Sequence, residues 1–188
     1  MCNDIDLICT APERCGGQCW KFGRRIHHDG TTEETVQERT EKRRDTIKEE
    51  CLAKFADRLS KRHILLLNWQ NDNTLMVHIR EDHPDFGCPQ IIATSWLQEM
   101  PGCCAILVSR NNSVLPIRHR RGFGSLLQEI KIWLRDRMGY GSLMCTVAGH
   151  NEAENHLLEK FGWVPHTSTF TNPKTNNQIR VWINHKSK

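Results

Sequence analysis

The chain has 188 residues, of which 38% are hydrophobic and 26% are charged. This composition provides enough apolar material for the core of one domain and excludes a chain that is disordered throughout. No apolar run reaches the ~20 residues that a membrane-spanning helix needs, so we predict no membrane insertion. The net charge of +4 is too small to indicate a dedicated nucleic-acid binder.

Residues 1–30 are rich in cysteine and glycine, and we interpret them as an irregular N-terminal arm. Thiolates and imidazoles are typical ligands of zinc, and the side chains of this kind in the arm are Cys9, Cys15, Cys19, His27 and His28. Their spacing differs from a standard zinc-binding pair, so zinc is the alternative, free thiols are the main interpretation, and no metal site is predicted. Because no signal peptide begins the chain, we expect a cytoplasmic protein with reduced cysteines.

A long helix is predicted next, because neither glycine nor proline occurs between residues 33 and 62. Thr31 and Glu34 form a capping box at its start. The apolar residues of its second half fall on one face at helical spacing and are Ile47, Cys51, Leu52, Phe55, Ala56 and Leu59. We interpret the polar first half as a solvated extension of this helix or as a separate short helix.

Four strands then follow, joined in pairs by turn sequences. The predicted strands are His63–Gln70, Thr74–Arg80, Ile91–Gln98 and Cys103–Arg110, and residues 113–117 extend or follow the fourth. The second half of the chain alternates helices and strands. Its predicted elements are a helix with an apolar stripe from Leu126 to Met138, a strand Leu143–Ala148, a second helix capped by Asn151 and Glu154, and a β pair Thr167–Thr171 and Ile179–Ile183. This order predicts an α/β (α+β) fold with a mixed, mostly antiparallel sheet flanked by helices.

The turn between the fourth strand and the next helix has residues suited to a pyrophosphate. A helix N-terminus presents N–H groups without partners and a partial positive charge. Gly122 and Gly124 allow a ligand to approach the backbone closely, and Arg118, Arg120 and Arg121 add positive charge. We therefore predict that phosphate groups bind at this turn.

Two motifs in this half resemble signatures of the GNAT acyltransferase superfamily, whose members use acetyl-CoA. The first runs from Val114 to Gly124 as VLPIRHRRGFG and matches V-x-P-x-x-[RQ]-x-x-G-x-[GA], except that His119 occupies the Arg/Gln position. The second is Asn151 followed by LLEKFGW at residues 157–163. Both motifs have the order and the spacing of the family.

The resemblance is specific over residues 103–165 and implies a GNAT-like domain over residues 31–188, in which strands four and five splay apart around the cofactor. It implies acetyl-CoA as the acyl donor. Backbone groups of Ser113 and Val114 would pair with the pantetheine arm, and Asn151 would reach the arm or cap the last helix. The residues whose N–H groups would hold the pyrophosphate are His119, Arg120, Arg121, Gly122, Phe123, Gly124 and Ser125. An amine would attack the thioester directly, and a backbone N–H of strand four would donate to the carbonyl oxygen.

The sequence departs from the family at the positions of the usual acid and base. Leu158 stands where many members have a tyrosine acid, and Thr146 stands where several have a glutamate base. Our candidates for the base are His150, which ends the fifth strand, and Glu99, in the turn before the fourth strand. A histidine exchanges protons near neutral pH, which suits a general base. The alternative is that both are ordinary solvated loop residues.

We expect an N-acetyltransferase that acts on an amine of a small molecule or a protein. Two other classes remain open. The missing tyrosine and glutamate favour an acyl-CoA-binding regulatory module without catalysis. The basic run Arg118–Arg121 together with a zinc-bound arm would fit a nucleic-acid-associated protein. That run is short and lies where a cofactor phosphate is expected, so binding of CoA is preferred.

Overall fold

The structure is a computed structural model that describes residues 33–71, 73–82 and 88–186. Its elements in chain order are α1 (Glu33–Phe55), the 3-10 helix η1 (Ala56–Arg58), β1 (His63–Asn71), β2 (Thr74–Glu81), β3 (Gln90–Met100), β4 (Cys103–Val114), the 3-10 helix η2 (Pro116–Arg118), α2 (Phe123–Met138), β5 (Ser142–Ala148), α3 (Glu152–Lys160), β6 (Val164–Thr171) and β7 (Gln178–His185). The predicted order of helices and strands is confirmed. The cysteine-rich arm and Thr31 of the predicted capping box lie outside the described residues.

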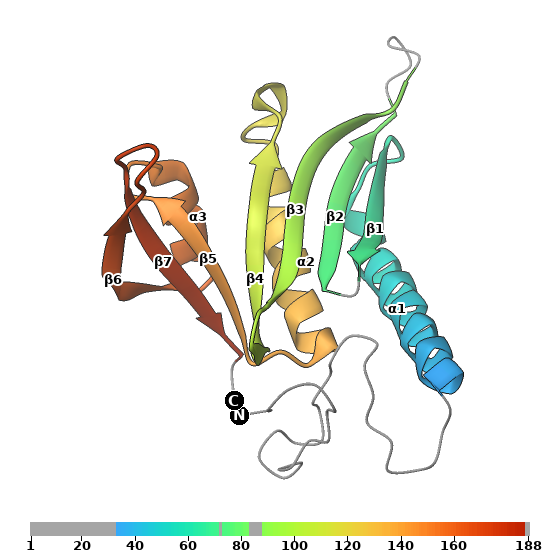
Figure 1. The fold of residues 1–188 in the computed structure, drawn as a ribbon. Coiled ribbons are helices and arrows are strands. Elements are labelled where there is room, and N and C mark those ends of the chain that lie inside the picture. The colour runs from blue at the N-terminus through green and yellow to red at the C-terminus, as the bar shows by residue number, and fades with distance from the viewer. Residues whose placement is uncertain (1–32, 72, 83–87, 187–188) are drawn as a thin grey trace.

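In the described part of the chain, seven strands form one sheet in the order β1-β2-β3-β4-β5-β7-β6 (Figure 1). Strands β4 and β5 are parallel, and every other neighbouring pair is antiparallel. The predicted α/β class with a mixed, mostly antiparallel sheet is therefore confirmed.

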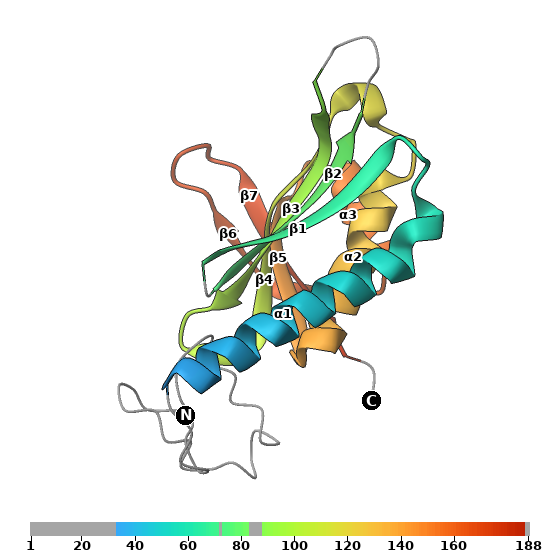
Figure 2. The same cartoon turned by 90° about the vertical axis from the view of Figure 1, so that its right-hand side faces the viewer.

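The three α-helices of the described residues lie on one side of this sheet (Figure 2). The apolar stripe of α2 is the centre of the core, and Ile130 and Leu134 have no exposed surface. Alternate residues of the strands point toward the helices, as in β2, where Val77 and Ile79 are fully buried. The helix Asn151 was expected to cap is α3, and the Asn151 side chain accepts a hydrogen bond from the N–H of Glu154 at 3.3 Å.

Helix α1 is shorter than its sequence predicts. It ends at Phe55, and η1 follows, although residues up to 62 contain no helix breaker. Ile47, Cys51 and Phe55 are buried against the core, whereas Ala56 is exposed and Leu59 has extended backbone angles. Pairing of β1 at the sheet edge therefore overrides the helical propensity of the last turns.

A buried polar junction joins the β5–α3 turn to β7. The Asn155 amide nitrogen donates to the carbonyls of Ala148, Gly149 and Asn151 at 3.4, 3.2 and 2.9 Å. Its Oδ1 accepts from Nε1 of the fully buried Trp182 at 3.0 Å. One side chain thus contacts three backbone carbonyls of the turn and accepts from a buried indole.

Replacement of this asparagine should destabilise the fold. We expect Asn155→Ala to lower the free energy of unfolding by about 1–3 kcal/mol, because the indole N–H of Trp182 is left buried without an acceptor. Urea denaturation measures the change. In a Trp182→Phe background, which has no indole donor, the same replacement should cost less. Equal costs in the two backgrounds would show that this hydrogen bond contributes nothing.

Candidate functional site

Strands β4 and β5 pair only at their N-terminal ends. The pairs are Ile106 with Ser142, Leu107 with Leu143 and Val108 with Met144, although β4 continues to Val114 and β5 to Ala148. Figure 1 shows the two strands diverging toward their C-terminal ends. The predicted splay is thus confirmed. Beyond it, the facing edges of β4 and β5 have backbone groups without a strand partner in the described chain, and such groups require a ligand or water.

A β-bulge lies in β4 immediately beyond its last pair with β5. The register with β3 shifts between the pairs Thr94–Ser113 and Trp96–Arg110. Asn111 and Asn112 therefore lie opposite Ser95 alone, and Asn111 has a φ of 50°. A bulge bends a strand and changes the direction of its backbone groups. This bulge therefore sets how β4 faces the opening.

The turn after β4 leads to an N-terminus of α2 that has no side-chain cap. Gly122 is the N-cap residue with a φ of 86°, in the left-handed region that favours glycine. The first bond of the helix runs from the N–H of Leu126 to the carbonyl of Gly122. The N–H groups of the three preceding helical residues therefore have no partner within the helix, and they face outward with the positive end of the helix dipole. This geometry fits the predicted phosphate site.

His119 is held within the turn. Its Nε2 lies 2.9 Å from the carbonyl oxygen of Val114, and its N–H donates to the carbonyl of Pro116 at 3.1 Å. The residue at the Arg/Gln position of the motif thus ties the end of β4 to η2. Its backbone N–H is already engaged, so the outward N–H groups of this turn come from residues after His119. Ser113, one residue before Val114, is exposed.

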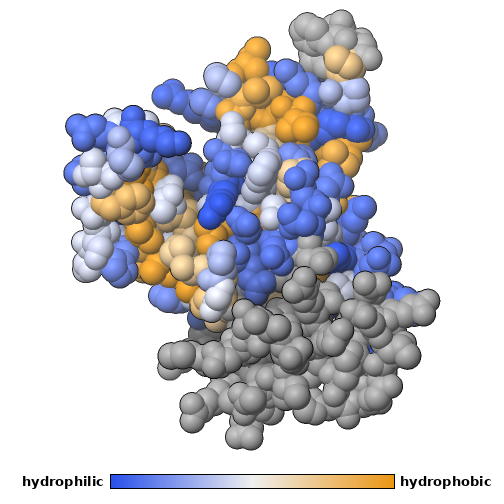
Figure 3. Space-filling model, viewed as in Figure 1, coloured by the Kyte–Doolittle hydropathy of each residue, from blue (hydrophilic) through white to orange (hydrophobic). Residues whose placement is uncertain are grey.

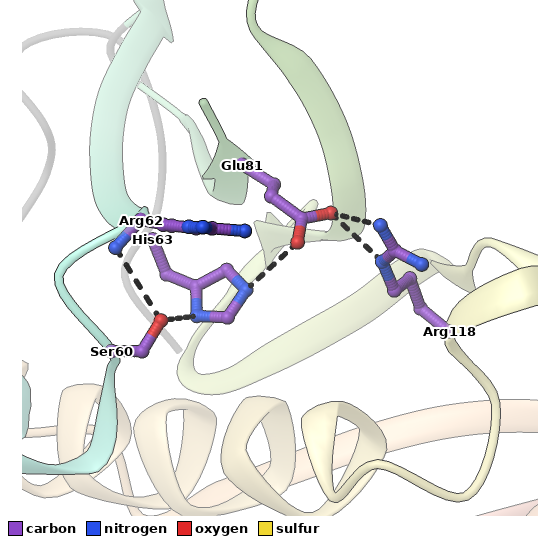
Figure 4. Close-up of polar contacts among 5 residues, drawn as sticks. All are labelled: Ser60, Arg62, His63, Glu81 and Arg118. Atoms are coloured by element: carbon purple, nitrogen blue, oxygen red, sulfur yellow. Dashed lines mark hydrogen bonds and ion pairs between the residues drawn. The ribbon is translucent and has the colours of Figure 1, made fainter. Parts of the chain in front are cut away.

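Arg118 belongs to a polar cluster at the start of β1 and the end of β2 (Figure 4). Its Nε and one terminal nitrogen donate to Oε2 of Glu81 at 2.8 and 2.6 Å. Nε2 of His63 lies 3.6 Å from Oε1 of the same carboxylate, and Nδ1 of His63 lies 2.8 Å from the Ser60 hydroxyl. The charge of Arg118 is therefore directed to Glu81 and anchors η2 to the sheet, whereas the sequence predicted that it would face a phosphate.

Arg120 and Arg121 are exposed and form no hydrogen bond or ion pair within the described chain. Phe123 is different, because its ring packs edge-on against His63 with centroids 5.1 Å apart, which leaves only its backbone for a ligand. A Cβ built at Gly124 would lie 3.3 Å from Cδ2 of Leu157, so this glycine also permits α2 and α3 to approach. The available positive charge of the turn is thus that of the two arginines and the helix N-terminus.

The two candidate bases, His150 and Glu99, lie in different parts of the fold. His150 is exposed in the turn after β5, at the splayed end of the sheet, and the neighbouring Asn151 serves as the cap of α3. Glu99 lies in β3, not in the predicted turn, because β3 extends to Met100, and it pairs with Leu107 where β4 and β5 are still together. From the level of Leu107 to the end of β5 the strand spans about 17 Å, so Glu99 lies far from His150.

The structure also shows a residue that sequence reasoning missed, Lys131 of α2. It is fully buried, and its Nζ donates to Oγ of Ser109 and Oδ1 of Asn112, both at 3.2 Å. The same Oδ1 accepts from the hydroxyls of Ser95 at 2.6 Å and Ser109 at 3.1 Å. Nζ also lies 5.7 Å from the ring centroid of Trp163. Lys131 thus lies behind the bulge of β4, on the helix side of the sheet.

Two buried polar atoms near this lysine have no hydrogen-bond partner, Oε1 of Gln128 and Nε1 of Trp163. Gln128 precedes Lys131 by one helical turn, and its amide nitrogen donates to Oε1 of Glu154 at 3.3 Å. Buried polar atoms of this kind are rare in native proteins and require a ligand or ordered water. Both atoms lie in the packed core, Oε1 of Gln128 on α2 and Nε1 of Trp163 directly before β6.

A signal for Lys131 exists in the sequence. Lys131 falls on the apolar stripe of α2, four residues after Leu127 and three before Leu134, where a charged residue is out of place.

A second missed group is His78 of β2, whose Nδ1 is buried without a partner. Burial lowers its pKa, so its ring is neutral at neutral pH. Its register partner is Thr94, which in turn pairs with Ser113 of β4.

The face of the sheet opposite the helices is the side seen in Figure 3. Apolar areas lie over the end of β4 with η2 and over β5 with β7, and hydrophilic residues lie between them. Thr146, whose neighbours Cys145 and Val147 point to the helices, is exposed on this face. No helix of the described residues is long and apolar enough to span a membrane. Nor does the described chain bring three histidine, cysteine, aspartate or glutamate side chains together as a metal site; the cysteines of the zinc hypothesis lie outside it.

The buried lysine makes stability depend on pH. Burial lowers the pKa of Lys131 to about 8, from 10.5. Between these values the unfolded chain holds more protons than the folded chain, so the free energy of unfolding rises with pH across this window. Relative to Lys131→Met, the parent should gain about 3 kcal/mol from pH 7.5 to 10.5.

Urea denaturation of both proteins across this range measures the difference. The comparison with the variant is needed because burial raises the pKa of Cys51 and Cys145 to about 12, and these thiols lower stability over the same range in both proteins. A difference that stays constant with pH would contradict a buried ammonium with a lowered pKa.

No family model matches the sequence, and no curated protein is similar to it in sequence. Solved structures are similar in fold. For a GNAT family acetyltransferase from Elizabethkingia anophelis with acetyl-CoA bound, the match covers 68% of this chain and 100% of that chain, with a TM-score of 0.52 and 9% identity. For an acetyltransferase from Bacillus subtilis in complex with CoA, it covers 66% and 99%, with a TM-score of 0.50 and 9% identity. For NAA60 from Arabidopsis thaliana in complex with a bisubstrate analogue, it covers 60% and 75%, with a TM-score of 0.51 and 9% identity.

These likenesses concern the fold, since the sequences are far below the identity at which function transfers. The chain therefore has the fold of the GNAT acetyltransferases.

Proposed function

We propose that the chain is an acyltransferase that transfers an acetyl group from acetyl-CoA to an amine. One observation carries the proposal: the unpaired edge of β4 beyond Val108 leads, through a single turn, into the uncapped N-terminus of α2. The first surface suits the amides of an extended arm, and the second suits a pyrophosphate. Related folds that hold acetyl-CoA or CoA support the same reading.

The residues present fit this cofactor. The N–H groups of Phe123, Gly124 and Ser125 would hold the pyrophosphate, with Arg120 and Arg121 adding charge. Bound acetyl-CoA would supply an activated acyl group as a thioester.

The pantetheine arm would lie along the opening between β4 and β5. Backbone groups of β4 up to Ser113 would pair with its amides, and the carbonyl of Val114 already has one partner in His119.

The acceptor amine would approach from the face opposite the helices, where Ser113 and Thr146 are exposed. The chain has no tyrosine or glutamate at the usual acid and base positions. Leu158 occupies the first position and is fully buried, and Thr146 occupies the second and has no basic group. A thiolate is a tolerable leaving group near neutral pH, so the step that needs help is removal of the amine's proton. Water or an exposed side chain would perform it.

The same absence favours a second candidate, a module that binds acyl-CoA without turnover. Calorimetry with CoA and an assay of thiol release from acetyl-CoA with a panel of primary amines separate the two candidates. Binding with thiol release supports the acyltransferase, and binding without release for every amine supports the module. Absence of CoA binding would overturn both.

Charge at the turn should control the affinity for CoA. We expect Arg120→Ala and Arg121→Ala each to weaken CoA binding by about three- to tenfold, since each removes an exposed positive charge from beside the pyrophosphate. Calorimetry at two salt concentrations should show a smaller loss at high salt. The control is Lys174→Ala, an exposed charge on the β6–β7 turn, which should leave the affinity unchanged. An equal loss in the control would assign the effect to net charge.

Removal of the exposed histidine should have a small effect. No hydrogen bond within the described chain orients the ring of His150, and an unoriented base contributes little. We expect His150→Ala to slow thiol release by less than about tenfold at each pH of a pH–rate profile. A loss of ~10²-fold or more, with a limb of the profile flattened, would identify His150 as the general base after all.

A further inference from the structure

The fold gives no structural reason for a lysine at position 131. Its neighbours on the stripe of α2 are apolar, and Leu127, Ile130 and Leu134 are all buried. An ammonium at such a site has a desolvation cost that a methionine or leucine would avoid. Its close partners are the neutral oxygens of Ser109 and Asn112, and no carboxylate among the described residues lies at ion-pair distance. Costs of this kind are characteristic of functional sites.

The contacts of Lys131 converge on the β4 bulge. Asn112 is itself an exposed residue, yet its Oδ1 is turned inward and accepts from Lys131, Ser95 and Ser109. The side chain is therefore fixed from three directions. The residue before it, Asn111, has a left-handed backbone conformation, which asparagine adopts more readily than most other L-residues.

The bulge lies where β4 has lost β5 as a partner. Pairing with β5 ends at Val108, and pairing with β3 is interrupted between Arg110 and Ser113. The amides of this segment are thus free on the side of the opening, and their direction depends on the shape of the bulge. A donor aimed at a carbonyl accelerates acyl transfer only if its direction is fixed before the reaction.

We propose that Lys131 is a positioning residue that fixes the side chain of Asn112 and thereby holds the β4 bulge in the shape that directs its free N–H groups at the thioester carbonyl. The inference rests on the proposed function, because it assigns a task within the same site. The ammonium also places a positive charge behind the bulge, where it would stabilise the negative charge that develops on the carbonyl oxygen during acyl transfer. Lys131 itself is buried and acts through Asn112.

Binding of two ligands to one variant tests this role. CoA lacks the acyl carbonyl, so only acetyl-CoA reports on N–H groups aimed at it. In calorimetry, Lys131→Met should bind CoA as the parent does, whereas the preference of the parent for acetyl-CoA over CoA should fall by about threefold or more. The infrared stretch of the thioester carbonyl in isotope-labelled acetyl-CoA is the second readout. It should be shifted down on the parent and return toward the free value on the variant.

A matched control distinguishes this role from a general loss of packing. Arg135 is a second buried cation on α2, bound to the carbonyl of Asn184 at 3.1 Å and distant from the bulge. Arg135→Met should lower stability but leave the ligand preference and the carbonyl frequency as in the parent. The same loss of preference in this control would overturn the proposal.

Asn112→Ala provides a variant that removes the acceptor shared by Lys131, Ser95 and Ser109 and changes no apolar residue of the core. It should reproduce the effect of Lys131→Met, and the double variant should show no further loss, because the lysine acts through the asparagine. Full additivity would overturn the proposal, as would an unchanged preference in Lys131→Met. If the parent fails to bind CoA, the proposed function is overturned first and this inference with it; CoA binding with an unchanged preference overturns the inference alone.

Discussion

Pairing between β4 and β5 stops after Val108 and Met144, and the rest of the site depends on this early stop. A sheet normally satisfies its backbone groups by pairing, so two parallel strands that separate while still extended expose amides to whatever enters between them. The bulge at Asn111 and Asn112 occurs at the point of separation. Because it bends β4, the bulge and the opening form one feature.

The core behind the sheet contains polar groups whose burial costs free energy. Gln128 and Trp163 each leave a buried polar atom without a partner, and Lys131 lies as a cation among apolar side chains. Gln128 and Lys131 lie on α2, and Trp163 directly precedes β6. Apolar side chains usually occupy core positions of this kind. Further buried polar atoms without a hydrogen-bond partner lie on β2 and β3, at His78, Arg80 and Thr94. Ordered water or a ligand usually completes the hydrogen bonding of such groups.

Positive charge in the turn before α2 is divided between two positions. Arg118 forms an ion pair with Glu81 and fastens η2 to the sheet, while Arg120 and Arg121 extend into solvent. His119, at the position of the family's Arg or Gln, closes the turn by contacting the carbonyl of Val114. The turn is therefore rigid through its own contacts before any phosphate binds, which reduces the entropy that binding must overcome.

Local rules of period, turn chemistry and the freedom of Gly122 specify the order of elements, the glycine turn and the asparagine cap of α3. The sequence also indicated the splay, through resemblance. Tertiary structure decided what local rules do not reach. Pairing in β1 ended α1 at Phe55, and extension of β3 to Met100 moved Glu99 out of the predicted turn and into the sheet. Whether a charged side chain such as Lys131 reaches solvent or lies behind a strand depends on contacts between residues far apart in the chain, and only the packed fold contains them.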